Sequence, residues 1–149
     1  AAEKGLRYFP GAAEILAAIS SRWPVAINSG ALRPEIEYAL DRLDRRSHVA
    51  AIVSAEDARN CKPHPEGYLL ALDAIRSHLG SALPADQCLV IEDTLAGIQS
   101  AKGAGMLAVG VTTTYSPDEL RQAGADDVVP NLLAFTPEWI EERFIASVR

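Results

Sequence analysis

The chain has 149 residues, of which 48% are hydrophobic and 23% are charged, so we expect one globular domain with a sizeable core. Its net charge of −6, with lysines and arginines scattered along the chain, argues against a nucleic-acid-binding surface. No apolar run reaches the ~18 residues that span a bilayer, and no signal peptide opens the sequence. We therefore expect a cytoplasmic protein with no membrane segment.

Short apolar segments that predict strands alternate with amphipathic segments that predict helices. In chain order, helices are expected at 14–22, 34–43, 65–79, 96–104, 117–123 and 137–148, the last of them capped by Thr136. Strands are expected at 25–27, 49–54, 88–91, 107–111 and 128–129. Continuous apolar strands between helices indicate a parallel sheet covered on both faces. The sequence thus predicts a single α/β domain over residues 1–149, a three-layer α/β/α doubly wound parallel sheet.

Polar residues follow three of these predicted strands. Ser29 and Gly30 follow the strand at 25–27, the loop after 49–54 leads to Lys62, and the strand at 88–91 runs into Glu92 and Asp93. Ligands of doubly wound sheets bind outside the carboxyl ends of the strands. All three groups are therefore expected at the same edge of the sheet.

Glu92 and Asp93 are adjacent acids at a predicted strand end, where like charges repel and lose hydration. A bound cation explains the pair, and Mg²⁺ is suited to one or two carboxylates together with water and phosphate oxygens. The alternative is that the two acids lie at a helix N-terminus, where the helix dipole stabilises negative charge. The pair alone does not decide between these two interpretations.

Ser29 and Lys62 are the candidate anion-binding residues. A hydroxyl beside Gly30, which has no side chain to block the backbone, can cradle a phosphate oxygen. The alternative is that Ser29 caps the helix at 34, although it lies several residues early. Lys62 precedes Pro63 and Pro65, which stiffen its segment, and lysine binds phosphate as a compact charge. Its alternative is a solvated surface lysine.

Other residues near this edge are expected to have ordinary roles. We interpret His64 as a loop histidine, Arg33 as a surface residue of a helix start, and Cys61 as a reduced thiol.

Together, Ser29, Lys62-Pro63-His64-Pro65 and Glu92-Asp93-Thr94-Leu95-Ala96-Gly97 resemble the haloacid dehalogenase (HAD) superfamily, and within it the β-phosphoglucomutase-like phosphatases. The flanking segments 8–11, 53–57 and 101–106 also resemble that family. The resemblance implies that Ser29 is the second-motif hydroxyl, Lys62 the third-motif lysine, and Glu92 and Asp93 the acids that bind Mg²⁺. It also implies a small phosphorylated metabolite as substrate.

One part of the family pattern is absent. The family's first motif, Asp-x-Asp-x-Thr, supplies the nucleophile and the general acid/base, yet no Asp-x-Asp occurs in this sequence. The resemblance implies that the first strand, which lies between the strands ending at Ser29 and Glu92, and the helical cap are not in this chain. Two inner strand edges would then be unpaired.

Two functions are therefore expected from the resemblance. The first is a phosphatase or sugar-phosphate phosphomutase that works through an aspartyl-phosphate, with this chain alone inactive. The second is a catalytically inactive HAD-like module that binds phosphate or a partner. A haloacid dehalogenase is disfavoured, because that chemistry does not need the acids at Glu92 and Asp93. The sequence indicates neither the substrate nor the oligomeric state.

Overall fold

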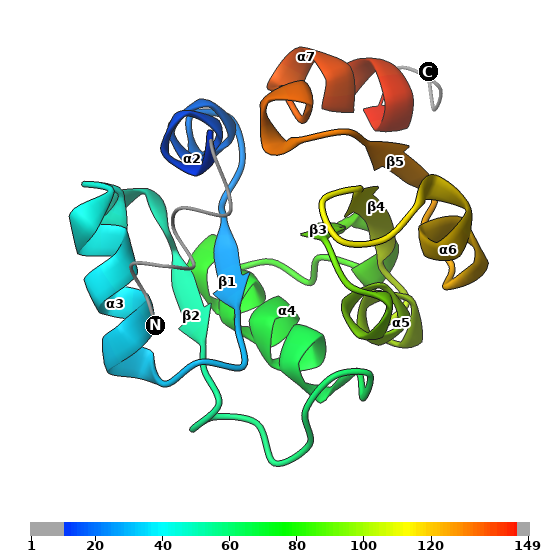
Figure 1. Cartoon of the computed structure of the whole chain (residues 1–149). Helices are drawn as coiled ribbons and strands as arrows, with labels where there is room; N and C mark the ends of the chain where they lie inside the picture. The colour runs from blue at the N-terminus through cyan, green and yellow to red at the C-terminus, as the bar shows by residue number, and fades with distance from the viewer. Residues whose placement is uncertain (1–10, 146–149) are drawn as a thin grey trace.

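The computed structural model describes residues 11–145, in which helices alternate with short parallel strands (Figure 1). The helices are α2 (Ala12–Ser20), α3 (Arg33–Arg42), α4 (Glu66–Leu79), α5 (Leu95–Gly103), α6 (Pro117–Gln122) and α7 (Pro137–Ile140). The strands are β1 (Ala26–Asn28), β2 (Ala51–Val53), β3 (Leu89–Glu92), β4 (Leu107–Val111) and β5 (Asp127–Val129). Every predicted element has a counterpart; β4 has the predicted ends, and the ends of the other elements are shifted. The flanking residues 8–10 and the predicted helical residues 146–148 lie outside the described range.

The helix predicted at 137–148 differs most from expectation. Thr136 caps it as predicted, its hydroxyl accepting a hydrogen bond from Trp139 N at 3.1 Å. The α-helix nevertheless ends at Ile140 and continues as a π-helical turn, Glu141–Ile145. In this turn Phe144 packs edge-on against Trp139, with 5.9 Å between ring centroids, and Arg143 pairs with Asp127 at 2.8 Å.

The strands form two parallel sheets rather than one continuous sheet. β1 pairs with β2, with Asn28 opposite Val53, while β3, β4 and β5 pair in chain order, with Glu92 opposite Gly110. Among residues 11–145, the second edge of β1 and the second edge of β3 have no strand partner. The unpaired inner edges expected from the resemblance are thus found at these two strands.

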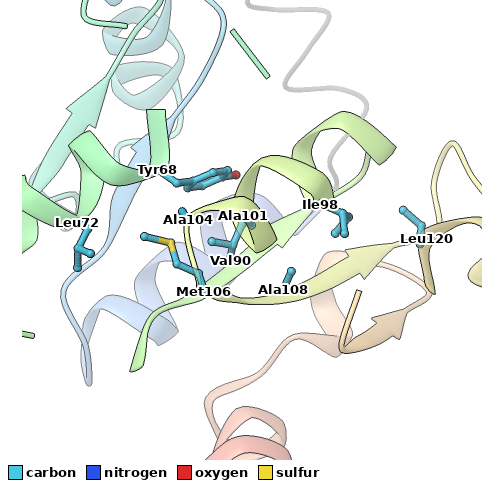
Figure 2. Close-up of a cluster of buried hydrophobic side chains, with 9 residues drawn as sticks. All are labelled: Tyr68, Leu72, Val90, Ile98, Ala101, Ala104, Met106, Ala108 and Leu120. Atoms are coloured by element: carbon cyan, nitrogen blue, oxygen red, sulfur yellow. The ribbon is translucent and has the colours of Figure 1, made fainter. Parts of the chain in front are cut away.

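The core lies on both faces of the β3–β4–β5 sheet. Successive residues of β4 point to opposite faces, so Ala108 joins one buried cluster and Val109 joins the other. Figure 2 shows the first cluster, which α4, α5 and α6 supply together with β3, β4 and the segment between α5 and β4. Ile15 of α2 and Ile140 of α7 belong to the second cluster. Helices therefore cover both faces, and the predicted three-layer α/β/α arrangement is confirmed.

Small residues let α5 lie close to its neighbours. Ala101 is fully buried, and Gly103 faces Pro65 at the start of α4, where an added Cβ would make an ordinary contact of 3.4 Å with the proline Cβ. Ser100, also fully buried, donates a hydrogen bond to the carbonyl oxygen of His64 at 2.7 Å. The loop before α4 is thereby held against α5.

No helix within residues 11–145 combines the length and the apolar character needed to cross a membrane.

Candidate active site

Lys62 connects the ends of the two sheets. Its ammonium donates to the carbonyl oxygen of Asn28, the last residue of β1, at 3.2 Å and to Oε1 of Glu92, the last residue of β3, at 2.5 Å. The loop lysine, the end of β1 and the end of β3 therefore meet at one edge.

Ser29 directly follows β1 at this edge. Its N–H donates to the carbonyl oxygen of Val53 at 3.0 Å, which extends the β1–β2 ladder by one step. Its hydroxyl accepts a hydrogen bond from Ala31 N at 3.1 Å. The residue at the cap position of α3 is Leu32, so the alternative that Ser29 caps this helix is wrong. Gly30 is exposed, and no neighbouring atom lies within 4 Å of a Cβ built on it, so its backbone is open to a ligand.

The first part of the loop after β2 is fixed by Asp57. One oxygen of its carboxylate accepts hydrogen bonds from the N–H and the hydroxyl of Ser54, at 2.7 and 2.9 Å, and pairs with Arg33 at 3.0 Å. The bonds from Ser54, with a smaller contribution from Arg33, lower the pKa of Asp57. Arg33 also donates to the carbonyl oxygen of Ile52 at 2.8 Å. Arg33 thus holds the loop in place.

The second part of the loop is fixed by Glu66, in the first turn of α4. Its carboxylate accepts hydrogen bonds from the N–H groups of Asn60 at 2.7 Å and Arg59 at 3.2 Å, and the bond from Asn60 is the main cause of its lowered pKa. Nδ1 of His64 accepts a hydrogen bond from Glu66 N at 3.1 Å. Lys62 therefore extends from a segment that is tied down on both sides. The sequence predicted stiffness from the prolines but missed Glu66, whose position in a first helical turn was the available signal.

Glu92 is buried, and one of its carboxylate oxygens accepts two hydrogen bonds. Its side chain is 8% exposed, and Oε1 accepts hydrogen bonds from both the Lys62 ammonium and the Tyr68 hydroxyl. Burial, followed by the charge of Glu92, raises the pKa of Tyr68, so the phenol stays protonated and donates. A Cβ on Gly97 would lie 2.6 Å from Glu92 Oε1 and closer still to Oε2. The first turn of α5 therefore has room for this carboxylate only because residue 97 is glycine.

Sequence reasoning placed Tyr68 in the apolar stripe of a helix and missed its role. The signal that could have found it is chemical, because a buried tyrosine hydroxyl usually has a hydrogen-bond partner.

Asp93 is half-buried beside Glu92. Partial burial, and then the charge of Glu92, raise its pKa, while a bond to its own backbone N–H and the charge of Lys62 act in the opposite direction. The cap of α5 is Thr94, whose hydroxyl accepts a hydrogen bond from Gly97 N at 3.0 Å, and no acid lies in the first turn. This geometry gives little support to the alternative that the two acids serve only to interact with the helix dipole.

Glu92 and Asp93 are the residues that could hold a metal ion. Within residues 11–145 they are not joined by a third His, Cys, Asp or Glu in a metal-binding group. Mg²⁺ binds through as few as one or two carboxylates and keeps several waters. The donor set fits this ion, with Asp93 the more available of the two acids.

An open depression of about 510 Å³ lies next to the lysine. It is lined by Arg59, Asn60, Cys61, Lys62, Pro63 and His64. Cys61 is an exposed free thiol. The loop that carries the lysine therefore faces solvent on this side.

The family model of the haloacid dehalogenase-like hydrolases matches residues 1–105. The chain belongs to this family. It is 34% identical over 114 residues to the validoxylamine A 7'-phosphate phosphatase of Streptomyces hygroscopicus subsp. limoneus, covering 76% of this chain and 51% of the relative. It is 32% identical over 129 residues to the phosphoglycolate phosphatase of Salmonella typhi, and the match covers 86% of this chain and 49% of that relative.

Solved structures agree with this assignment. The β-phosphoglucomutase of Clostridium difficile superimposes with a TM-score of 0.73 at 26% identity, over 94% of this chain and 57% of that protein. The chain thus spans about half the length of the curated phosphatases it matches and little more than half of this phosphomutase.

Proposed function

We propose that this chain is the core portion of a Mg²⁺-dependent, cytoplasmic phosphoryl-transfer hydrolase, a phosphatase or a sugar-phosphate phosphomutase that acts on a small phosphorylated metabolite. The observation that carries the proposal is the position of Lys62, whose ammonium contacts the ends of both β1 and β3. A hydroxyl, an ammonium and two acids then serve one edge of the molecule. The named phosphatases and the phosphomutase among its relatives support this class of chemistry.

The proposal gives each residue a distinct task. Ser29, with the open backbone of Gly30, binds a phosphate oxygen, and Lys62 offsets the charge of the transferred group. Asp93 and Glu92 would hold the metal, with Asp93 as the direct ligand, while Glu92 also holds Lys62. When bound, the metal neutralises phosphate charge and orients the group for in-line transfer.

Turnover through an aspartyl-phosphate needs a nucleophilic carboxylate, and the sequence has no Asp-x-Asp to supply one. We therefore expect the 149-residue chain to release no phosphate from p-nitrophenyl phosphate. An engineered extension that places a strand ending in Asp-x-Asp-x-Thr beside β1 and β3 should restore Mg²⁺-dependent release.

Variants of the extended protein test the assignments. Lys62→Met and Asp93→Asn should each abolish the restored activity. Lys102→Met is the matched control, because Lys102 pairs with Asp126 at 2.8 Å away from this edge, and it should stay active. Restored activity that survives both site substitutions would refute the proposal.

The second candidate is a catalytically inactive HAD-like module that binds phosphate or a partner. The absence of Asp-x-Asp in the sequence favours it. Phosphate binding that depends on Lys62, together with no gain of turnover in the extended protein, would support this alternative over the first.

A further inference from the structure

One oxygen of Glu92 accepts two hydrogen bonds from side chains of very different mobility. Tyr68 is 8% exposed, and its ring is packed within the first core cluster (Figure 2). In that view its hydroxyl points away from Leu72, toward the side of the cluster where Ile98 and Leu120 lie. The Lys62 side chain is 26% exposed and has several rotatable bonds. The phenol is thus a fixed donor, and the ammonium is a donor that can turn away.

The ammonium of Lys62 also lies over the Tyr68 ring, 5.2 Å from its centroid. Lys62, Tyr68 and Glu92 therefore form one contact set, with the ring beneath the lysine and the hydroxyl on the same carboxylate oxygen. If Lys62 turned toward a bound phosphate, the buried carboxylate would lose one of its two donors. A buried charge that loses its partners is strongly disfavoured, so the remaining donor decides whether the lysine can leave.

We propose that Tyr68 is a positioning residue that acts through Glu92: its hydroxyl keeps the buried carboxylate satisfied and in place while Lys62 turns its ammonium toward a bound phosphate. This inference rests on the proposed function. Without the hydroxyl, Lys62 would be the only side chain within residues 11–145 that donates to Glu92 Oε1, and it would be held there more tightly. Phosphate would then have to compete harder for the ammonium.

The test measures the affinity of the 149-residue chain for inorganic phosphate, in the presence of Mg²⁺, by ³¹P NMR titration. Tyr68→Phe keeps the ring and removes only the hydroxyl. We expect it to weaken phosphate binding about tenfold, the effect of losing a hydrogen bond to a charged group. Tyr38→Phe is the matched control, because Tyr38 is an exposed tyrosine on α3, and its affinity should not change.

A double variant separates positioning from a merely structural role. If Tyr68 acts by releasing Lys62, then Tyr68→Phe should change the residual phosphate affinity of Lys62→Ala by less than about twofold. The same tenfold loss in both backgrounds would overturn the inference, as would an unchanged affinity in folded Tyr68→Phe alone.

A second measurement needs no substitution. Mg²⁺ and phosphate together should change the ultraviolet absorption of Tyr68, because its hydroxyl donates to the same Glu92 oxygen as Lys62. An unchanged spectrum at saturating phosphate would count against the inference. A chain that binds no phosphate, or whose affinity is the same in Lys62→Ala, would refute the proposed site and this inference together. If only the Tyr68 inference is wrong, phosphate binding still depends on Lys62, and this result differs from failure of the proposed site.

Discussion

Gly97→Ala tests whether the position of Glu92 depends on the absence of a side chain in the first turn of α5. The added Cβ would lie 2.6 Å from Glu92 Oε1 and closer to Oε2, so either the carboxylate or the helix must move. Glu92 cannot move without disturbing its bonds to Lys62 and Tyr68.

The expected cost follows from three contributions. Overpacking of a buried site costs about 1–3 kcal/mol, and loss of one hydrogen bond to a charged group costs about 1.5–3 kcal/mol. Replacement of glycine by alanine within a helix returns about 1 kcal/mol. We therefore expect the free energy of unfolding to fall by about 1.5–5 kcal/mol, which lowers the urea midpoint by roughly 0.5 M or more.

The matched control is Gly103→Ala in the same helix. Its Cβ would have Pro65 as nearest neighbour at 3.4 Å, an ordinary contact, so the substitution should be neutral or stabilising by up to about 1 kcal/mol. In a Glu92→Ala background the carboxylate is gone, and the penalty of Gly97→Ala should largely disappear. A Gly97→Ala protein as stable as the unsubstituted chain, or a penalty that persists without the Glu92 side chain, would refute this account of the site.

Substitutions at three further positions test the loop and the helix that flank the site. Asp57→Asn should lower the free energy of unfolding at neutral pH. Because the pKa of Asp57 is lowered in the folded state, the difference in stability between the variant and the unsubstituted chain should shrink as the pH falls through and below ~3.8. A difference that stays constant across this range in urea titrations would contradict the prediction. Ser100→Ala should lose about 1 kcal/mol on urea unfolding, since the carbonyl of His64 loses its buried donor, and full stability would argue against the anchor. Thr94→Ala should lose about 1 kcal/mol by thermal or urea unfolding, whereas Thr94→Ser should keep the cap and most of the stability.

The elements that the sequence predicted well are those whose pattern is local. β4 matches the apolar run 107–111 residue for residue. Thr136 caps α7, as its position just before the helix-starting proline predicted. The end of that helix was not predictable in this way. Contacts of Trp139 with Phe144 and of Arg143 with Asp127 accompany its change to a π-helical turn, and helical periodicity does not register these contacts.

The candidate site shows the same division. Placing Lys62 and the acids at one edge needed only the rule that parallel strands end together. The hydrogen-bond partners of Tyr68 and Ser100 could not be read from the sequence, because they lie 24 and 36 positions away. Arg33 was expected at a helix surface, and its contact with Asp57 likewise depends on the packing of the loop.

The anchored loop between β2 and α4 has a consequence for proteolysis. Asn60, Cys61 and Pro63 are exposed, so the loop has the accessibility of a cleavage site. Proteases, however, need several residues to unfold locally into an extended shape, and here that would break the backbone contacts to Glu66 and Ser100 at once. Trypsin should therefore cut after Arg59 slowly in the native chain, and much faster once Glu66 or Ser100 no longer holds the loop.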